Sequence, residues 1–544
     1  MLLTGEPIHY NTPNQDMSSH RGLMTEEPLL MGIDVGTFGS KGVLCTPRGR
    51  VVAVHSVEHG LSAPRPGWAE QDADAVWWAD VCGITRGLLA KADVGSDRVA
   101  ALGISALGPD LAVLDATGRA LRPAILYGVD TRATREIADL DERFGAGAMA
   151  EMGGNYLNSQ AVGPKILWLR RHEPDTFART RYLCTASTFL VYRLTGEYVL
   201  DYHTAALFGP LFDRQRLSWS TRYAEPVLGD IPLPRLAWSD EIAGAVTDWA
   251  AEQTGLRPGT PVTGGNLDAI AEAVSVGVVQ PGDLMVMYGT TTFFVLALDR
   301  PPAASRLVWN TPYIRPGLHN LEFGTATTGA FTRWLRDNFA QRELAAQAEG
   351  GTDAYDVLTA EAARVPPGSQ GMVVLPYLSG ERTPLYDPDA RGVVIGLSLA
   401  HGRGHLYRAA LEAIAYAAAH NLEAMRAAGG AARRAVAVGG GAKSDLLLQI
   451  VSDVTGIEQE LPAQTIGASY GDAFLAGLAG GLLDLAALTA DWVRITRRFV
   501  PDPARREAYQ PYYRVYRELY PQTREAMHRL AQLTRVPPHV DAHP

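Results

Sequence analysis

The feature that most constrains the fold is a run of three consecutive strands at the start of the folded chain. Hydrophobic patterning predicts strands over 29–34, 41–46 and 51–57, with turns between them. A helix over 72–92 and a strand over 99–105 follow. This βββαβ order excludes the strict strand–helix alternation of a Rossmann domain and predicts an α/β fold of another kind.

The same pattern restarts in the second half of the chain. Strands are predicted over 283–288 and 293–298, again separated by a Gly/Thr turn. Helices follow, and a strand over 435–438 ends in three glycines before a helix over 444–455. The sequence therefore contains a weak internal duplication, which predicts two related domains.

Composition places the chain among globular proteins and excludes several functions. Its 544 residues suffice for about two to four domains, and 47% hydrophobic with 20% charged residues excludes global disorder. A net charge of −10 without a Lys/Arg cluster argues against nucleic-acid binding, and no apolar run reaches the roughly 18 residues that span a membrane. Three cysteines without a CxxC pair favour the reducing cytoplasm. Residues 1–28 lack a signal-peptide pattern and are expected to form a flexible extension.

The turn between the first two strands carries groups suited to phosphate. Gly36 and Gly39 let the backbone bend so that N–H groups converge, and Thr37 and Ser40 add hydroxyls. Asp34, at the end of the strand, could hold Mg²⁺ through water. The alternative interpretation is a tight hairpin in which the Asp only caps the turn.

Two further glycine-rich segments lie in the second half. The turn 289–292 (Gly-Thr-Thr-Thr) repeats the design of the first loop, and a cleft between duplicated domains needs one phosphate loop from each side. The segment 439–444 (Gly-Gly-Gly-Ala-Lys-Ser) joins a strand to a helix N-terminus, which favours anions. It matches neither a Walker A loop nor GxGxxG, and its alternative interpretation is a glycine-rich strand–helix turn.

A single carboxylate, Asp268, follows the strand end at 261–264. Phosphoryl transfer to an alcohol needs a base or a hydrogen-bond acceptor on the hydroxyl, and an Asp at this place could supply it. Without its context, Asp268 would be interpreted as a helix N-cap.

Together these features resemble the FGGY carbohydrate kinases, from about 29 to 533. The resemblance rests on the order of the three glycine loops, on Asp268, on the repeated opening, and on the stretches 67–72, 165–168, 193–196, 375–384 and 389–392. The segment 376–392 is most like xylulokinases. The resemblance implies two duplicated ribonuclease-H-like (actin-like ATPase) domains with a cleft between them, over 29–276 and 277–500, followed by a capping helix and tail over 501–544.

The resemblance also implies a mechanism, an ATP-dependent phosphorylation of a small ketose or polyol. Asp268 corresponds to the general base of the family, and Asp34 would lie near Mg²⁺. The residues expected to bind ATP are Gly36, Thr37, Lys41, Gly289, Thr290, Thr291, Gly440, Gly441, Ala442 and Ser444. The alternative is a non-catalytic ATP-binding sensor or scaffold of the same superfamily, against which Asp268 argues.

The sequence departs from xylulokinases where the acceptor would bind. Residues 107–110 (Leu-Gly-Pro-Asp) lack the polar pair of the family, 127–132 is one residue longer than the family motif, and Ala269 follows the predicted base. We therefore expect an acceptor other than D-xylulose, held by Asp110, Tyr127, Asp130 and Asn266. The other expectations are a cytoplasmic location and no nucleic-acid or membrane partner. The oligomeric state stays open, with a homodimer as one option.

Overall fold

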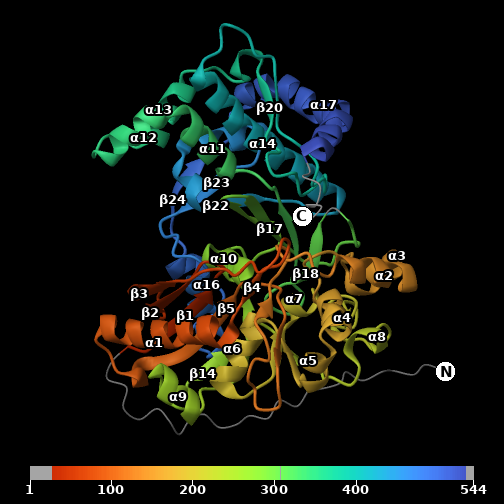
Figure 1. The fold of residues 1–544 in the computed structure, drawn as a ribbon. Coiled ribbons are helices and arrows are strands. Elements are labelled where there is room, and N and C mark those ends of the chain that lie inside the picture. Colours follow the sequence, from red (N-terminus) through yellow and green to blue (C-terminus); the bar gives the residue numbers. More distant parts are fainter. Residues whose placement is uncertain (1–26, 307, 535–544) are drawn as a thin grey trace, which may run out of the picture.

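The computed structural model describes residues 27–306 and 308–534. Nearly all of the predicted extension (1–28) and the last ten residues of the predicted tail lie outside the described residues. The described part forms two halves, each built on a twisted mixed sheet, with the first half below and the second above in Figure 1.

The first sheet runs in the order β13-β14-β5-β1-β2-β3, and β15 pairs with β5 beside β14. Its strands are β1 (Leu29–Val35), β2 (Gly39–Cys45), β3 (Val51–Glu58), β5 (Val99–Ala106), β13 (Ile242–Ala245), β14 (Pro261–Thr263) and β15 (Asn266–Leu267). The first three strands are antiparallel, and β1 pairs in parallel with β5. The predicted three-strand opening is therefore present, with bounds shifted by one or two residues.

The second sheet repeats the strand path β3-β2-β1-β5-β14-β13 of the first. Its order is β18-β19-β17-β16-β22-β23-β24. Its strands are β16 (Asp283–Tyr288), β17 (Thr292–Leu298), β18 (Trp309–Pro312), β19 (His319–Gly324), β22 (Arg434–Val438), β23 (Gln459–Pro462) and β24 (Ile495–Phe499). The antiparallel meander consists of β19, β17 and β16, and β22 and β23 continue the sheet in parallel with β16. Strand β18 has no counterpart in the first sheet. The predicted duplication is confirmed.

Two helices lie between the sheets, α10 (Asp268–Ser275) and α16 (Ala468–Ala479) (Figure 1). Although α16 comes late in the chain, it packs on β1 and β5 of the first sheet. The backbones approach so closely that a Cβ on Gly32 would lie 1.9 Å from the Ser469 carbonyl oxygen. A core of side chains from both sheets and both helices joins the halves here.

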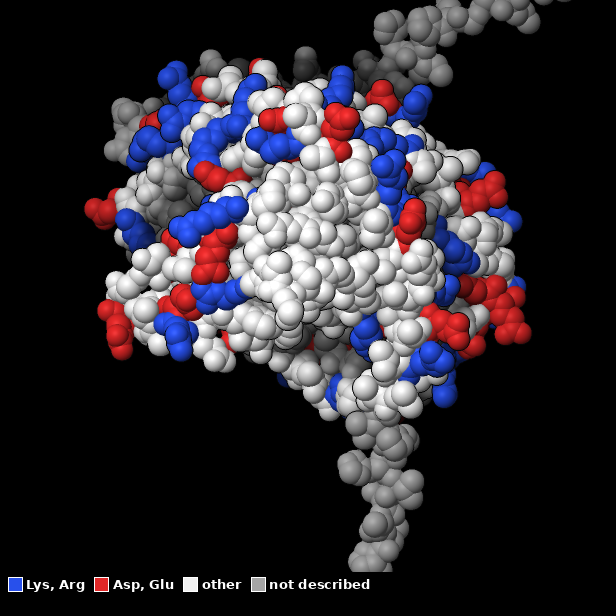
Figure 2. Space-filling view, turned by 90° about the horizontal axis from the view of Figure 1, so that it is seen from above, with Lys and Arg blue, Asp and Glu red and all other residues white. Residues whose placement is uncertain are grey.

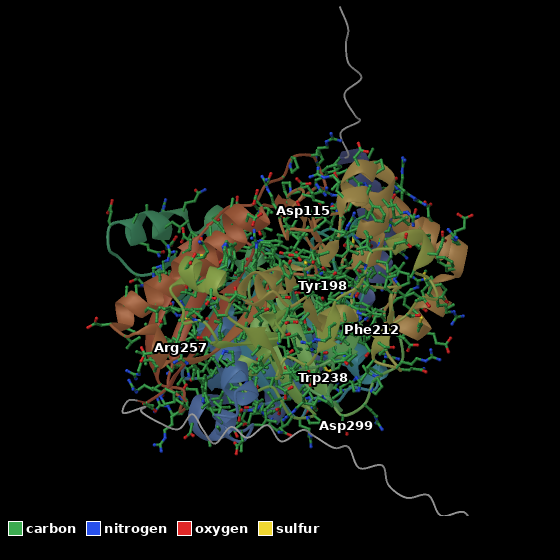
Figure 3. All side chains as sticks on the ribbon, turned by 90° about the horizontal axis from the view of Figure 1, so that it is seen from below. Asp115, Tyr198, Phe212, Trp238, Arg257 and Asp299 are labelled. Atoms are coloured by element: carbon green, nitrogen blue, oxygen red, sulfur yellow. The ribbon has the colours of Figure 1, made fainter. Side chains whose placement is uncertain are left out.

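The first half is completed by α1 (Ala79–Ala92) and a mainly helical layer. Helix α1 covers β2 and β3 after a π-helical turn over Ala73–Trp78, which Asp72 caps. The layer contains α2 (Thr134–Phe144), α3 (Ala146–Gly153), α4 (Val162–His172), α5 (Pro174–Arg179), α6 (Ala186–Thr195), α7 (Tyr202–Ala205), α8 (Glu225–Leu228) and α9 (Asp248–Thr254). Figure 3 views the molecule from below, with Tyr198 of this half near the middle and Asp299 of the second half near the rim.

Short strand pairs brace this layer and one loop of the second half. They are β4 (Glu70–Gln71) with β7 (Ala124–Ile125), β6 (Ala112–Leu114) with β8 (Tyr182–Cys184), β9 (Val199–Asp201) with β12 (Arg235–Ala237), β10 (Phe212–Asp213) with β11 (Ser218–Trp219), and β20 (Val373–Leu375) with β21 (Val393–Ile395). Tyr198, just before β9, donates its hydroxyl to the Leu183 carbonyl at 3.0 Å and so ties β9 to β8.

Helices cover the second sheet on its outer face. They are α11 (Gly329–Phe339), α12 (Gln341–Ala348), α13 (Ala354–Ala363), α14 (Arg403–Ala427), α15 (Asp445–Thr455) and α17 (Pro503–Thr534). The tyrosine-rich end of the chain forms α17, which packs on α14, α15 and β20 through buried Tyr509 and Tyr516. Of the helices in the described ranges, none is both long and apolar enough to cross a membrane.

Candidate active site

The end of β1 places Asp34 in a small buried polar network. The Ser105 hydroxyl oxygen lies 2.8 Å from Oδ1 of Asp34 and 2.7 Å from Oδ2 of Asp472. A hydroxyl has one proton to donate, so one of the two carboxyls must donate to Ser105 instead. Burial raises the pKa of Asp472 well above its ordinary value, and that of Asp34 only to about 6. Asp472 is therefore the neutral partner, and Asp34 is the one that can carry charge.

The predicted phosphate loop is a short turn between β1 and β2. The Gly36 N–H donates to the Gly39 carbonyl at 3.0 Å, and the Thr37 hydroxyl lies 3.0 Å from that of Tyr127. Lys41 donates to the Ile466 carbonyl at 2.9 Å, which links the loop to the segment before α16. Lys41 and Asp34 also line a cavity of about 360 Å³ together with Glu272.

Asp268 is the first residue of α10, with one oxygen accepting from the Ala269 N–H at 2.7 Å. Among the described residues nothing donates to its other oxygen. Burial raises the pKa of Asp268 to about 8, and the negative charge of Asp34 adds to the rise. One turn later, burial raises the pKa of Glu272 to about 7. A carboxylate in this setting gains basicity, which is the property a general base needs.

Two of the predicted acceptor residues have buried polar atoms that no described residue satisfies. Asp110 is fully buried, and while its Oδ1 accepts from the Ala186 N–H, its Oδ2 is unpaired. Burial raises the pKa of Asp110 to about 7. The Nδ2 of Asn266 is likewise buried and unpaired. Such groups are costly unless a ligand or water completes them.

Asp130 differs from these candidates because the protein itself occupies both of its oxygens. The Arg132 guanidinium donates to it at 2.6–3.0 Å, and the Ala69 N–H donates at 2.7 Å. The expectation that Asp130 holds an acceptor hydroxyl finds no support in these contacts. Tyr127 remains available, since among the described residues its hydroxyl contacts only that of Thr37.

On the second half, the loop 289–291 sits at the start of α11. The Gly289 and Thr290 carbonyls accept from the backbone N–H groups of Gly329 and Thr328, both at 3.0 Å. Behind it, the hydroxyls of Thr292 and Thr328 lie 2.7 Å apart. Thr291 closes the turn by accepting from the Gly289 N–H at 2.9 Å. This hydrogen-bonded threonine cluster fixes the loop, and its members after Thr292 were missed because 325–328 shows no glycine pattern.

The predicted adenosine segment divides into exposed and buried positions. Ala442 is 4% exposed and belongs to the core of the second half. A Cβ on Gly441 would lie 2.8 Å from Cβ of Tyr288, whereas a Cβ on Gly440 would meet open space. Ser444 caps α15 by accepting from the Leu447 N–H at 3.3 Å. The packing thus accounts for the glycine at 441, and only Gly440 is left free for a ligand.

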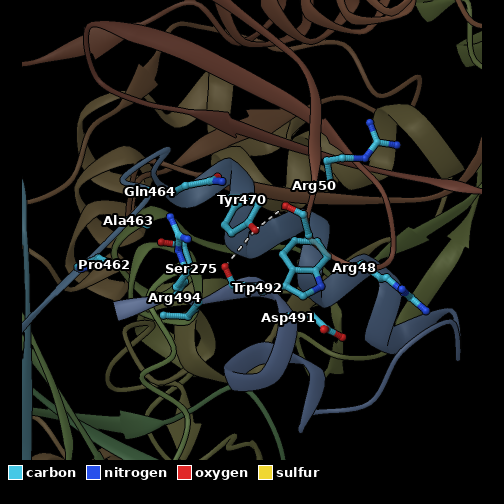
Figure 4. Close-up of a pocket in the computed structure, with 12 residues that line it drawn as sticks. Arg48, Arg50, Ser275, Pro462, Ala463, Gln464, Tyr470, Asp491, Trp492 and Arg494 are labelled. Carbon is cyan, nitrogen blue, oxygen red and sulfur yellow. Dashed lines mark hydrogen bonds between the residues drawn. The ribbon is translucent and has the colours of Figure 1, made fainter. Parts of the chain in front are cut away.

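Another cavity lies away from these residues. It has a volume of about 480 Å³ and is lined by the turn 48–50, the segment 462–464, Tyr470 and the segment 491–494. Figure 4 shows Arg48 and Arg50 on one side of the Tyr470 and Trp492 rings and Arg494 on the other. Because the guanidinium groups do not converge and no carboxylate of the Asp34–Asp268 cluster reaches it, this cavity is not the catalytic site.

Comparison with known proteins agrees with this geometry. The models of the N-terminal and C-terminal domains of the FGGY family of carbohydrate kinases match residues 29–275 and 284–480. A xylulose kinase of Escherichia coli (strain K12) is 32% identical over 91% of this chain and 99% of its own. An autoinducer-2 kinase of Klebsiella pneumoniae is 31% identical over 90% and 93%. The crystal structure of xylulose kinase from Rhodospirillum rubrum superposes with a TM-score of 0.84 at 33% identity, covering 92% of this chain and 100% of that one. The chain belongs to the FGGY family of carbohydrate kinases and is an ATP-dependent sugar kinase.

Proposed function

We propose that Asp268 is the general base of this kinase. It takes the proton of an acceptor hydroxyl while that oxygen bonds to the γ-phosphorus and the bond from phosphorus to the ADP oxygen breaks. The supporting observation is the half-buried carboxylate with one free oxygen and a pKa raised to about 8 by burial. Asp268→Asn keeps the shape but removes the basicity, so phosphorylation should fall at least about 10²-fold with ADP affinity kept. Near-normal turnover would exclude Asp268.

The phosphates of ATP are proposed to lie between the two Gly/Thr loops. Gly36, Thr37 and Lys41 would approach from the first half, and Gly289, Thr290 and Thr291 from the second. Adenosine would lie against Gly440, where a ligand has open space. Gly441, Ala442 and Ser444 would contribute through the backbone only, since packing or capping occupies their side-chain positions.

Mg²⁺ is proposed to accompany the nucleotide near Asp34. The residues fit this role because burial raises the pKa of Asp34, Asp268 and Glu272, the negative charge of Asp34 adds to the rise at the other two, and a nearby cation would offset that repulsion. Among the described residues no group of three or more His, Cys, Asp or Glu side chains could hold a metal ion by itself. When bound, the ion neutralises charge on the phosphates.

The acceptor is proposed to be a small ketose or polyol other than D-xylulose. Asp110, Tyr127 and Asn266 carry the polar atoms that can hold its hydroxyls. A site that hydrogen-bonds its substrate discriminates strongly, because an unmatched buried polar group costs about 1–3 kcal/mol. Measuring kcat/KM over pentuloses, tetruloses, hexuloses and polyols tests this. An optimum at D-xylulose would overturn the proposal about the acceptor, whereas the proposal that Asp268 is the general base would still stand.

We also propose a cytoplasmic homodimer. All three cysteines are unpaired, as suits a reducing compartment. Between Arg391 and Arg403 the chain carries no charged side chain, and Leu397 and Leu399 are 69% and 108% exposed. Seen from above, the second half presents a broad uncharged area framed by charged residues (Figure 2). Such an area is typical of an interaction surface. Light scattering of the purified protein and of Leu399→Asp tests the dimer.

A further inference from the structure

Arg382 is half-buried, and its guanidinium makes no hydrogen bond or ion pair with any described residue. It lies in the Gly-Glu-Arg-Thr-Pro stretch of the second half, to which the mechanism above gives no role. A partly desolvated cation without a partner is costly, so a group of this kind usually has a ligand.

The backbone around Arg382 is fixed on both sides. Glu381 accepts from the backbone N–H groups of Ala326 and Arg382, both at 2.7 Å. Thr383 accepts from the Gly324 N–H at 2.8 Å. These bonds hold the segment against the end of β19, so the backbone that carries the Arg382 side chain is fixed in place.

The guanidinium lies beside the end of β19, close to the second Gly/Thr loop. A Cβ on Gly324 would be 3.8 Å from its Nη1, and Gly324 pairs with Phe293, next to the loop 289–292. From the first half, Tyr127 comes close enough to be affected by it. Burial raises the pKa of the Tyr127 hydroxyl, and the Arg382 guanidinium counteracts that rise. The same hydroxyl contacts Thr37 of the phosphate loop.

The neighbouring carboxylate, Glu381, makes no ion pair with this charge. Oε1 of Glu381 accepts from two backbone N–H groups, and the guanidinium counteracts only part of the rise that burial causes in the pKa of Glu381. An anion placed between the loops would meet the guanidinium in a partly water-excluded setting. In such a setting, an arginine can donate two parallel N–H groups to the oxygens of a phosphate.

We propose that Arg382 contacts the phosphoryl group while it passes from ADP to the acceptor. This rests on the proposed function. As the acceptor oxygen forms its bond to phosphorus and gives its proton to Asp268, the bond to the ADP oxygen breaks. Arg382 exchanges no proton in this step. It stabilises charge on the phosphoryl oxygens, an interaction that is strongest in the transition state.

An acceptor with its own carboxylate could satisfy the same guanidinium. The two possible anions, the phosphoryl group and an acceptor carboxylate, can be distinguished by the acceptors whose phosphorylation depends on Arg382. If Arg382 contacts the phosphoryl group, its loss lowers kcat for every acceptor and for hydrolysis of ATP by water. If Arg382 instead binds the carboxylate of an acceptor, its loss raises KM for an aldonate and leaves KM for neutral ketoses and polyols unchanged.

The test compares Arg382→Ala and Arg382→Lys with Arg300→Ala, which removes one exposed cation elsewhere on the second half. We expect Arg382→Ala to lower kcat about 10²-fold or more with neutral acceptors, with KM for ATP little changed. ADP with aluminium fluoride, a mimic of the phosphoryl in transit, should bind at least tenfold more weakly, while ADP alone binds as before. Added guanidinium should restore part of the rate.

Unchanged kcat and unchanged binding of ADP with aluminium fluoride in a folded Arg382→Ala protein would overturn the proposal, as would an effect confined to an aldonate. Failure of the proposed function would show differently. In that case the unmodified protein phosphorylates no ketose, polyol or aldonate, or Asp268→Asn turns over normally.

Discussion

At the residue scale, the raised pKa values make activity depend on pH. Burial and Asp34 raise the pKa of Asp268 to about 8, and Glu272 adds a smaller rise. Only the deprotonated carboxylate is a base, so kcat/KM should increase as pH rises from 6 toward 8 and level off above. Glu272→Gln removes one negative charge, so the rise of kcat/KM with pH should occur at lower pH in this variant. If kcat/KM of Glu272→Gln rises over the same pH range as that of the unmodified protein, Asp268 does not control the rate.

Two neighbouring glycines should respond differently to a side chain. Gly441→Val drives a Cβ to within 2.8 Å of Tyr288, so it should cost roughly 1–3 kcal/mol of stability. Gly440→Val meets open space and should instead raise KM for ATP, with KM for the acceptor kept. Thermal denaturation and steady-state kinetics of the pair separate these effects. A raised KM for ATP in Gly441→Val alone would reverse the assignment.

Sequence patterns identified the chemistry of single residues better than their surroundings. Asp34 and Asp268 were found because each follows a strand end with glycines nearby. The neutral partner of Asp34, Asp472, lies over 400 positions away inside an apolar helix, and nothing local marks it. Asp130 was chosen for its polarity, whereas Arg132, two residues later, is what satisfies it.

At the scale of elements, the contact between α16 and the first sheet depends on glycine. A Cβ would lie 1.9 Å from a backbone oxygen at Gly32 and 2.1 Å from one at Gly103. Gly32→Ala should therefore be strongly destabilising, by about 3 kcal/mol or more. Gly83→Ala, on the open face of α1, should stabilise by roughly 0.5–1 kcal/mol. Urea denaturation of both variants checks this, and equal midpoints would contradict it.

Strands and long helices were predicted to within a few residues because their periodicity is local. The strand over 283–288 has the predicted bounds, and α15 begins one residue after its predicted start at 444. Short pairs such as β9 with β12 were not predicted, since two- or three-residue strands carry no periodicity. The packing of α16 on the first sheet is a non-local contact that no window of sequence contains.

At the scale of the whole molecule, the proposed site is complete only when both halves contribute. Asp34, Asp268 and Tyr127 come from the first half, and Gly289 and Arg382 from the second. The halves meet through α10 and α16, whose shared core lies between the two sheets (Figure 1). A motion about these helices would bring the loops together around the phosphates without breaking either sheet, and it would exclude water as a competing acceptor.

We therefore expect the molecule to become more compact when both substrates are bound. Small-angle scattering of Asp268→Asn, which should bind without turnover, is the direct measurement. The radius of gyration should fall most with an ATP analogue and acceptor together, and less with either alone, because only the ternary state fills both the nucleotide and the acceptor positions between the halves. ATP hydrolysis by the unmodified enzyme should stay slow until an acceptor is present. Hydrolysis as fast as sugar phosphorylation, with an unchanged radius, would mean that water reaches the phosphates freely and that closure is not part of the mechanism.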